Sequence, residues 1–265
     1  MRRLSEIIGG ILILVGVMTL FSMLGIHLWG FFWAFALIAL GVWFIRGVRV
    51  GRQFCPAEEV SIPLSGAAEA DIVLAHGAGR LILDSGGAPE TLLSGTCGGG
   101  VEVTKDREGD RLRVVLRLKE RDPFNVMFPW ISGRRAGLDW NVKLNPSVPT
   151  ALHLETGACE SALRLTDMRL RELSIRTGAS STTVDLPARA GRTRVIVESG
   201  AASVRLRVPD DVAARVRIHA GLSGVHVDTG RFPSTGDGYQ SPDFATAENA
   251  VDLDVESGVG SIEVF

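Results

Sequence analysis

The chain has 265 residues, of which 28 are Lys or Arg and 30 are Asp or Glu, giving a formal net charge of −2. This balance excludes the strong positive charge that nucleic-acid-binding domains carry, and no nucleic-acid partner is expected. Only three cysteines are present, none of them in CxxC spacing, so neither a disulfide framework nor a zinc site of paired cysteines is predicted.

Two uncharged apolar runs, residues 7–24 and 28–45, open the chain. As helices each would extend about 27 Å, close to the ~30 Å hydrocarbon core of a bilayer. Residues 1–52 are therefore expected to form a two-helix transmembrane hairpin, with a bilayer as partner. The expected membrane anchors are Trp29, Trp33, Trp43, Arg46 and Arg49. Arginines flank the hairpin on both sides and none lies in its turn, so the positive-inside rule predicts the cytoplasmic membrane, with the C-terminal domain in the cytoplasm.

Residues 53–265 repeat a phrase in which two apolar–x–apolar segments flank a glycine. Between Gly157, Gly178, Gly200 and Gly221 the steps are 21, 22 and 21 residues. A fixed period of this size is typical of stacked supersecondary units, so the fold class predicted is a helical hairpin followed by an all-β solenoid-like domain. The repeats lie near residues 72–84, 152–165, 173–186, 195–208, 216–227 and 253–264.

The alternation of apolar and polar residues within the repeats predicts strands with one face in the core and one face exposed to solvent. After Gly200, for example, Val204, Leu206 and Val208 are expected to face inward, while Arg205 and Arg207 face outward. The central glycine is expected to turn a corner between two short strands, where a positive φ is common and a Cβ is unwelcome.

Two segments interrupt the regular repeat. Residues 121–135 combine apolar and basic side chains, which favours either a docking loop for a membrane or partner, or a cap on one end of the core. The candidate docking residues there are Phe124, Met127, Phe128, Trp130, Arg134 and Arg135. Residues 230–249, rich in Gly and Pro, account for the 37-residue step from Gly221 to Gly258 as an ordered loop or a lost strand pair.

Basic side chains are concentrated between Glu160 and Arg217, where eleven arginines stand against seven acidic residues. A basic outward face there, with Arg205 and Arg207 as candidate docking residues, would suit an anionic leaflet, an acidic partner or the acidic last strand of another copy. A solvated arginine-rich face is the alternative.

No catalytic constellation, metal motif or cofactor motif is found in the sequence, and no enzymatic activity is predicted. The histidines form no HExxH motif, and no GxSxG motif occurs. His219 and His226 flank the Gly221 corner and could approach each other. Asp252, Asp254 and Glu256 alternate on one expected strand and so share a face; paired carboxylates occur in glycosidases, but such a row also fits a solvated face.

Both ends of the chain resemble one family. Residues 8–16 and 36–43 look like the paired helices of the LiaF-type transmembrane domain, although LiaF-type proteins often have more than two helices. Residues 239–242, 247–249, 251–255 and 258–262 resemble the end of the toast-rack domain, an adhesin-like β domain of LiaF-like and PspC-related bacterial proteins. The resemblance implies a bacterial membrane protein that senses or regulates envelope stress, and it implies no catalytic residue.

The function favoured by these features is that of a non-enzymatic, membrane-anchored interaction protein with a membrane or signalling protein as partner. A self-assembling, membrane-associated solenoid scaffold similar to bactofilins is the alternative, and a homo-oligomer is compatible with both. A protein that binds or cleaves envelope polysaccharide is the third hypothesis.

Overall fold

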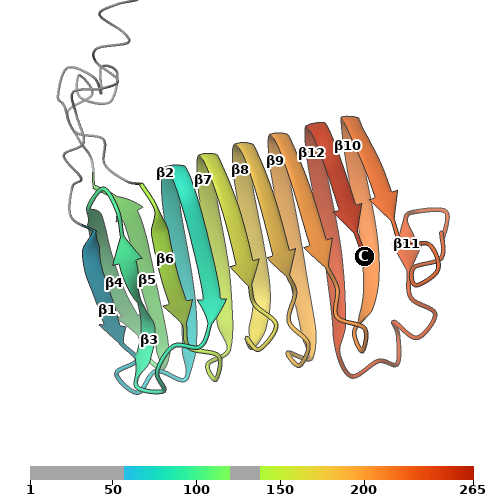
Figure 1. Cartoon of the computed structure of the whole chain (residues 1–265). Helices are drawn as coiled ribbons and strands as arrows, with labels where there is room; N and C mark the ends of the chain where they lie inside the picture. The colour runs from blue at the N-terminus through green and yellow to red at the C-terminus, as the bar shows by residue number, and fades with distance from the viewer. Residues whose placement is uncertain (1–56, 120–137) are drawn as a thin grey trace, which may run out of the picture. The chain divides into compact units, whose positions relative to one another are not determined.

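A computed structural model describes residues 57–119 and 138–265, which fall in one compact unit (Figure 1). These residues form a sheet of twelve strands, and Gly-, Pro- and Asp-rich turns separate them. The strands are β1 (Glu58–Pro63), β2 (Glu69–Ser85), β3 (Thr91–Cys97), β4 (Val101–Glu108), β5 (Arg111–Leu118), β6 (Trp140–Leu144), β7 (Thr150–Arg164), β8 (Leu170–Asp185), β9 (Arg192–Arg207), β10 (Ala213–Val227), β11 (Tyr239–Gln240) and β12 (Ala250–Val264).

Six long strands pair in parallel in the spatial order β2, β7, β8, β9, β12, β10. Each bends near its middle, so that the strands stand beside one another as a row of arches (Figure 1). We call the residues before the bend the first leg, those after it the second leg, and the bend the crest. Each crest carries one repeat glycine: Gly77, Gly157, Gly178, Gly200, Gly258 or Gly221.

The core lies between the two legs, because alternate side chains of each leg point toward the other leg. In β7, Leu152 and Leu154 of the first leg and Leu163 of the second leg are at most 1% exposed. Burial of each such side chain contributes roughly 1.5–3 kcal/mol. The expected inward positions Val204, Leu206 and Val208 are also buried, which confirms the alternation predicted there.

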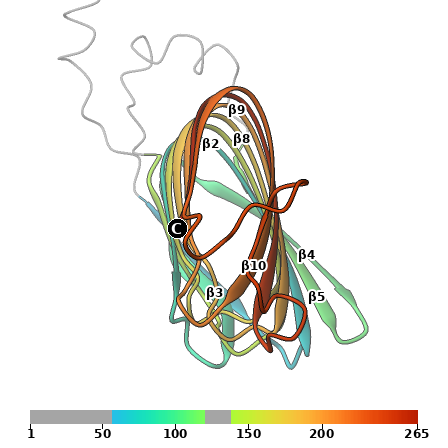
Figure 2. The ribbon, with the colours of Figure 1, turned by 90° about the vertical axis from the view of Figure 1, so that its right-hand side faces the viewer.

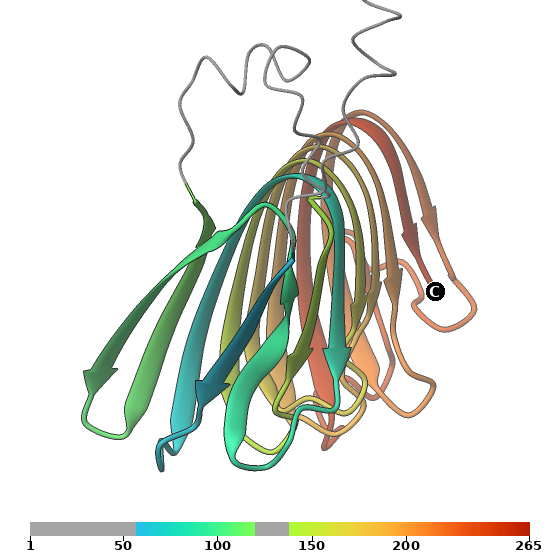
Figure 3. The ribbon, with the colours of Figure 1, turned by 60° about the vertical axis from the view of Figure 1, so that its left-hand side comes forward.

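At the N-terminal end the arch divides into two branches (Figure 3). The first leg of β2 pairs with β5, which in turn pairs with β4. The second leg of β2 pairs with β6, and the sheet goes on from β6 to β3 and then to β1. Trp140 is buried beneath this end and donates its indole N–H to the carbonyl oxygen of Gly98 at 3.0 Å. This hydrogen bond links β6 to the turn between β3 and β4.

At the other end the strand order departs from the chain order. β10 does not pair with β9, the strand before it in the chain. The C-terminal strand β12 lies between β9 and β10 and pairs with both. The segment from 228 to 249 carries the chain back and is ordered. It includes β11, which pairs with Arg215 and Val216 of β10. Phe232 and Phe244 of this segment are 0% and 7% exposed.

The repeat glycines are needed for close approach and not for a left-handed backbone. None of them has a positive φ, which corrects the expected corner geometry, and each arch is one bent strand instead of two short ones. The glycines stack from arch to arch. A Cβ on Gly157 would lie 2.4 Å from the carbonyl oxygen of Gly77, and one on Gly178 would lie 3.0 Å from that of Gly157. Neighbouring crests can approach only because these positions lack side chains.

The predicted fold class, a helical hairpin joined to a β domain, is wrong as a whole. The described residues are all-β and contain no helix, and among them no segment is a helix able to cross a bilayer. The β-rich solenoid-like part of the prediction is supported, because the repeats with period-2 alternation form the long paired strands. The segments predicted as the hairpin, 7–24 and 28–45, and its five anchor residues lie outside the described residues.

Candidate functional site

The outer face of the first leg carries rows of polar side chains, because residues in register on neighbouring parallel strands stand side by side. Arg194, Asp252 and Arg215 form one row across β9, β12 and β10. In the next row toward the crest, Asp254 stands beside Arg217. Arginines of β9 and β10 are thereby brought together around the carboxylates of β12, which lies between them.

Phe244 contacts two arginines of this face, Arg192 and Arg215. Its ring packs on Ala213 and Ala250, whose small side chains leave a seat for it on β10 and β12. The guanidinium carbons of Arg192 and Arg215 lie 5.5 and 5.0 Å from the ring centroid, within the range of cation–π attraction. Arg192 also donates to the carbonyl oxygens of Phe244 and Ala245, at 3.4 and 3.2 Å.

Asp252 is the carboxylate at the centre of this group. Arg215 forms a bidentate contact with Asp252: its Nε donates to Oδ1 at 3.0 Å and its Nη2 donates to Oδ2. Nη2 of Arg217 lies 3.5 Å from Oδ1 of Asp252 and 3.7 Å from Oδ2 of Asp254. The hydrogen bond from Arg215 lowers the pKa of Asp252, against the opposing effect of burial. Asp252 therefore stays ionised and is unsuited to donate a proton.

The arginines line a hollow of about 430 Å³, which we call the arginine hollow. Asp252 is the only carboxylate among its lining residues, and Glu172 and Asp254 flank it. Arg194 forms no ion pair within the described residues, and Nε of Arg217 is buried without a hydrogen-bond partner there. The lining arginines are Arg171, Arg192, Arg194, Arg215 and Arg217. Arg171 forms an ion pair with Glu69 at 3.1 Å, whereas Arg194 keeps N–H donors that suit an anionic group.

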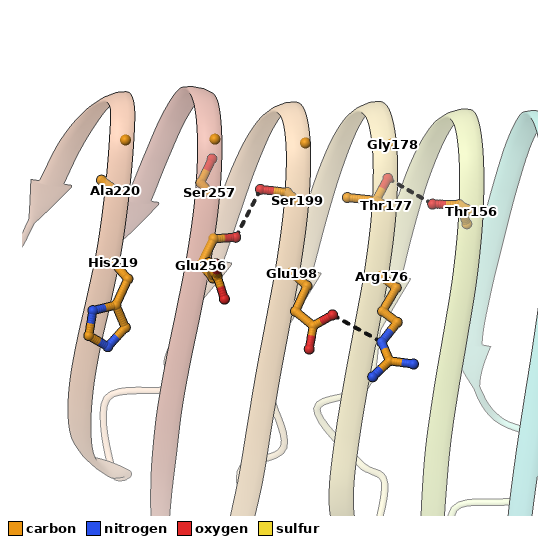
Figure 4. Close-up of a pocket in the computed structure, with 13 residues that line it drawn as sticks. Thr156, Arg176, Thr177, Gly178, Glu198, Ser199, His219, Ala220, Glu256 and Ser257 are labelled. Carbon is orange, nitrogen blue, oxygen red and sulfur yellow. Dashed lines mark hydrogen bonds and ion pairs between the residues drawn. The ribbon is translucent and has the colours of Figure 1, made fainter.

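A second, larger hollow of about 900 Å³ lies on the same face just below the crest (Figure 4). Its upper border is the glycine row and its lower border is a row of charged or polar side chains. In that row Arg176 and Glu198 form an ion pair at 3.0 Å. Thr156 and Thr177 bond through their hydroxyls at 2.8 Å. Within residues 57–119 and 138–265 no three His, Cys, Asp or Glu side chains are placed to hold a metal ion.

The docking residues predicted on β9 lie elsewhere. Arg205 and Arg207 follow Gly200 and so project from the second leg, where they are exposed and paired with Glu263 at 2.9 Å and Asp185 at 3.1 Å. Neither contributes to the arginine hollow. The six candidates between Phe124 and Arg135 lie outside the described residues, and their docking role stays a prediction.

The other chemical candidates do not converge. Asp252, Asp254 and Glu256 share the outer face of β12, as the alternation predicts, but the first two are paired with arginines. His219 and His226 lie on opposite legs of β10. Burial, with a contribution from Glu58, raises the pKa of the Cys97 thiol to about 12, and burial also raises the pKa of Cys159. Both thiols are therefore poor nucleophiles.

The order of arginines and repeat glycines along the chain carries a signal for the arginine hollow. Arginines that precede a repeat glycine belong to the first leg, and those that follow it belong to the second. Arg171, Arg192, Arg194, Arg215 and Arg217 all precede theirs. No sequence pattern pointed to Phe244, because its seat forms only when the last loop folds back over β10 and β12.

Comparisons with known proteins identify the fold. Residues 52–207 match the family model Toast_rack_N, the N-terminal domain of toast_rack, DUF2154. The structure resembles the crystal structure of a candidate cell adhesion protein from Clostridium sporogenes, with TM-score 0.68 and 21% identity, over 78% of this chain and 97% of that one. A candidate adhesin from Bacteroides fragilis matches with TM-score 0.31 and 7% identity, over 80% and 98% of the two chains. No curated protein matches the chain in sequence.

Proposed function

The chain belongs to the toast-rack family, since more than half of it matches that family's model, and we propose that it acts by binding an acidic protein partner in the arginine hollow. A β domain with adhesin-like neighbours in fold is consistent with a non-enzymatic interaction protein. The chemistry of the hollow supports an acidic surface as its ligand.

The observation that carries the proposal is the arginine surplus at one place. Arg192 and Arg194 have no carboxylate partner within the described residues, and Arg217 keeps an unpartnered buried Nε–H. An incoming carboxylate could bind Arg192 and Arg194, which are exposed, and Phe244 already holds Arg192 in place. Arginine is the side chain that interfaces favour for such contacts.

A matched pair of variants tests the proposal. Arg194→Glu reverses a charge in the hollow, and Arg207→Glu reverses one on the opposite leg. Intact complexes of both variants and the wild type are isolated from native membranes by crosslinking, and their components are identified. The expected result is one protein with an acidic surface that is lost with Arg194→Glu and retained with Arg207→Glu. Equal recovery with both variants would count against the hollow.

We further propose, on the LiaF-like and PspC-related resemblance, that the interaction serves a sensor or regulator of bacterial envelope stress at the cytoplasmic membrane, with the β domain in the cytoplasm. Support comes from the C-terminal residues 251–255 and 258–262, which carry the resemblance. Reporter transcription under cell-wall stress, compared between wild type, Arg194→Glu and a deletion strain, tests this role. Unchanged transcription in the deletion strain under every envelope insult would remove the regulatory part.

The alternative of a self-assembling filament has less support. A filament needs both ends of the sheet to accept a neighbour. At the N-terminal end, β1 carries Glu58, Glu59 and Pro63, and β4 carries charged residues from Lys105 to Glu108. Charges and proline on edge strands oppose pairing with another chain.

A further inference from the structure

The last arch, β10, has one free edge. On its outer side only Arg215 and Val216 pair with β11, and within the described residues no strand pairs with 217–227 on that side. Figure 2 looks onto this end, where β10 is the last long strand and the returning loop with β11 lies in front of part of it. The backbone N–H and C=O groups of this segment that point away from β12 therefore have no sheet partner. A free edge of this kind is a template to which another strand can add.

This edge lacks the features that normally protect one. From Ile218 to Val227 the chain contains no Lys, Arg, Asp, Glu or Pro. The edges at the N-terminal end, by contrast, carry Glu58 and Pro63 on β1 and Lys105 on β4. The difference between the two ends indicates that the β10 edge is built to be paired.

The open end also exposes part of the core. Val225 occupies an inward position, in register with the fully buried Ile262 of β12, yet it is 41% exposed. At the crest Leu222 is 83% exposed and its neighbour Val259 is 51% exposed. The returning loop caps the lower part of this end with Phe232. Over the upper part, the residues that the structure describes form no polar cap of the kind that terminal repeats need.

We infer that a second copy of this chain covers this end, with the segment 217–227 of β10 pairing with the same segment of its partner across a two-fold axis. A strand that pairs with its own copy in this way is antiparallel to it, and the interface closes after two subunits. Residues 218–227 contain no Lys, Arg, Asp or Glu, so over this stretch the strand pairs with its own copy without like-charge repulsion. The charged edges of β1 and β4 would not complement it, so a head-to-tail chain of copies is disfavoured.

Molar mass in solution tests the inference. The full chain is examined in a mild detergent by size exclusion with light scattering, with the mass of the detergent subtracted. The wild type is expected at twice the monomer mass. Leu222→Lys with Val225→Lys places charges on both sides of the axis at positions that are already exposed, so it is expected to weaken dimerisation by at least about tenfold. A wild type that stays monomeric over the whole concentration range overturns the inference.

A matched control adds the same charge at the other end. Ser61→Lys with Thr104→Lys changes exposed residues of β1 and β4 and is expected to leave the dimer intact. Dissociation by this control would indicate head-to-tail contacts and would contradict the two-fold pairing. A dimer that survives Leu222→Lys with Val225→Lys would also contradict it.

Hydrogen exchange of the unmodified chain gives a readout that does not depend on variants. Amides of residues 217–227 are expected to exchange more slowly at high protein concentration than at low concentration, while those of β4 stay unchanged. Protection of 217–227 that is independent of concentration would overturn the inference, because it would place the partner strand within the same chain.

Discussion

The glycine row at the crest allows a graded test of how the arches pack. Gly157→Ala would place a Cβ 2.4 Å from the carbonyl oxygen of Gly77, and Gly178→Ala would place one 3.0 Å from that of Gly157. In both cases the obstructing atom is backbone, which no rotamer change can move. Gly224 is a matched control, a strand glycine of β10 without a positive φ, whose added Cβ would come no closer than 4.0 Å to any neighbour.

The expected costs follow from these distances. Overpacking in a well-packed site costs about 1–3 kcal/mol, so Gly157→Ala should lie near the upper end and Gly178→Ala near the lower end. Gly224→Ala should be neutral or stabilise by about 0.5 kcal/mol, because alanine loses less backbone entropy on folding. For a domain of this size 1 kcal/mol corresponds to about 2–4 °C in Tm. Gly157→Ala is therefore expected to lower Tm by about 6–12 °C.

Thermal unfolding of the full chain, followed by the circular dichroism of its strands, measures this series. The order of stability should be Gly224→Ala, then Gly178→Ala, then Gly157→Ala. If Gly157→Ala unfolds at the same temperature as Gly224→Ala, the crests do not approach as closely as the structure requires, and the account of the repeat glycine is refuted.

Three further predictions concern the arginine hollow and the buried thiol. The lowered pKa of Asp252 stabilises the fold above the unfolded-state pKa near 4, and this contribution is lost as the pH falls through the lower folded-state value. Asp252→Asn should therefore unfold with a flatter pH dependence below about pH 4 in acid titrations, and an unchanged slope would contradict this. Phe244→Ala should cost about 3 kcal/mol in urea unfolding, because it empties the seat on Ala213 and Ala250; a loss below about 1 kcal/mol would argue against that seat. Cys97, 0% exposed and with its thiol pKa raised to about 12, should react with a maleimide only as fast as the domain opens, and fast labelling of the native protein would refute its burial.

The strands could be predicted from the sequence because their signal is local. Alternation after Gly200 is sufficient to place Val204 and Leu206 inside and Arg205 outside, and the structure agrees. The role of the glycines was only half accessible. Their period indicated stacking, but whether a glycine serves a positive φ or a close approach depends on the neighbouring arch, which lies 21 or more residues away in the chain.

The position of the last strand and of the arginine hollow could not be read from periodicity. β12 and β10 carry similar apolar patterns and both pair in parallel, so nothing local indicates that β12 enters between β9 and β10. That insertion brings Asp252 beside Arg215, and the loop it requires brings Phe244 over Ala250. The hollow therefore depends on long-range topology.

Photo-crosslinking in the cell tests whether an acidic partner occupies the arginine hollow. A photoreactive amino acid replaces Arg194 in one strain and Arg207 in another. Position 194 is expected to yield an adduct with one acidic protein, Arg217→Gln in the same chain is expected to reduce this adduct, and position 207 is expected to yield none of it. The same adduct from both positions, or none from position 194 while the protein is folded and abundant, would show that the hollow does not bind an acidic partner.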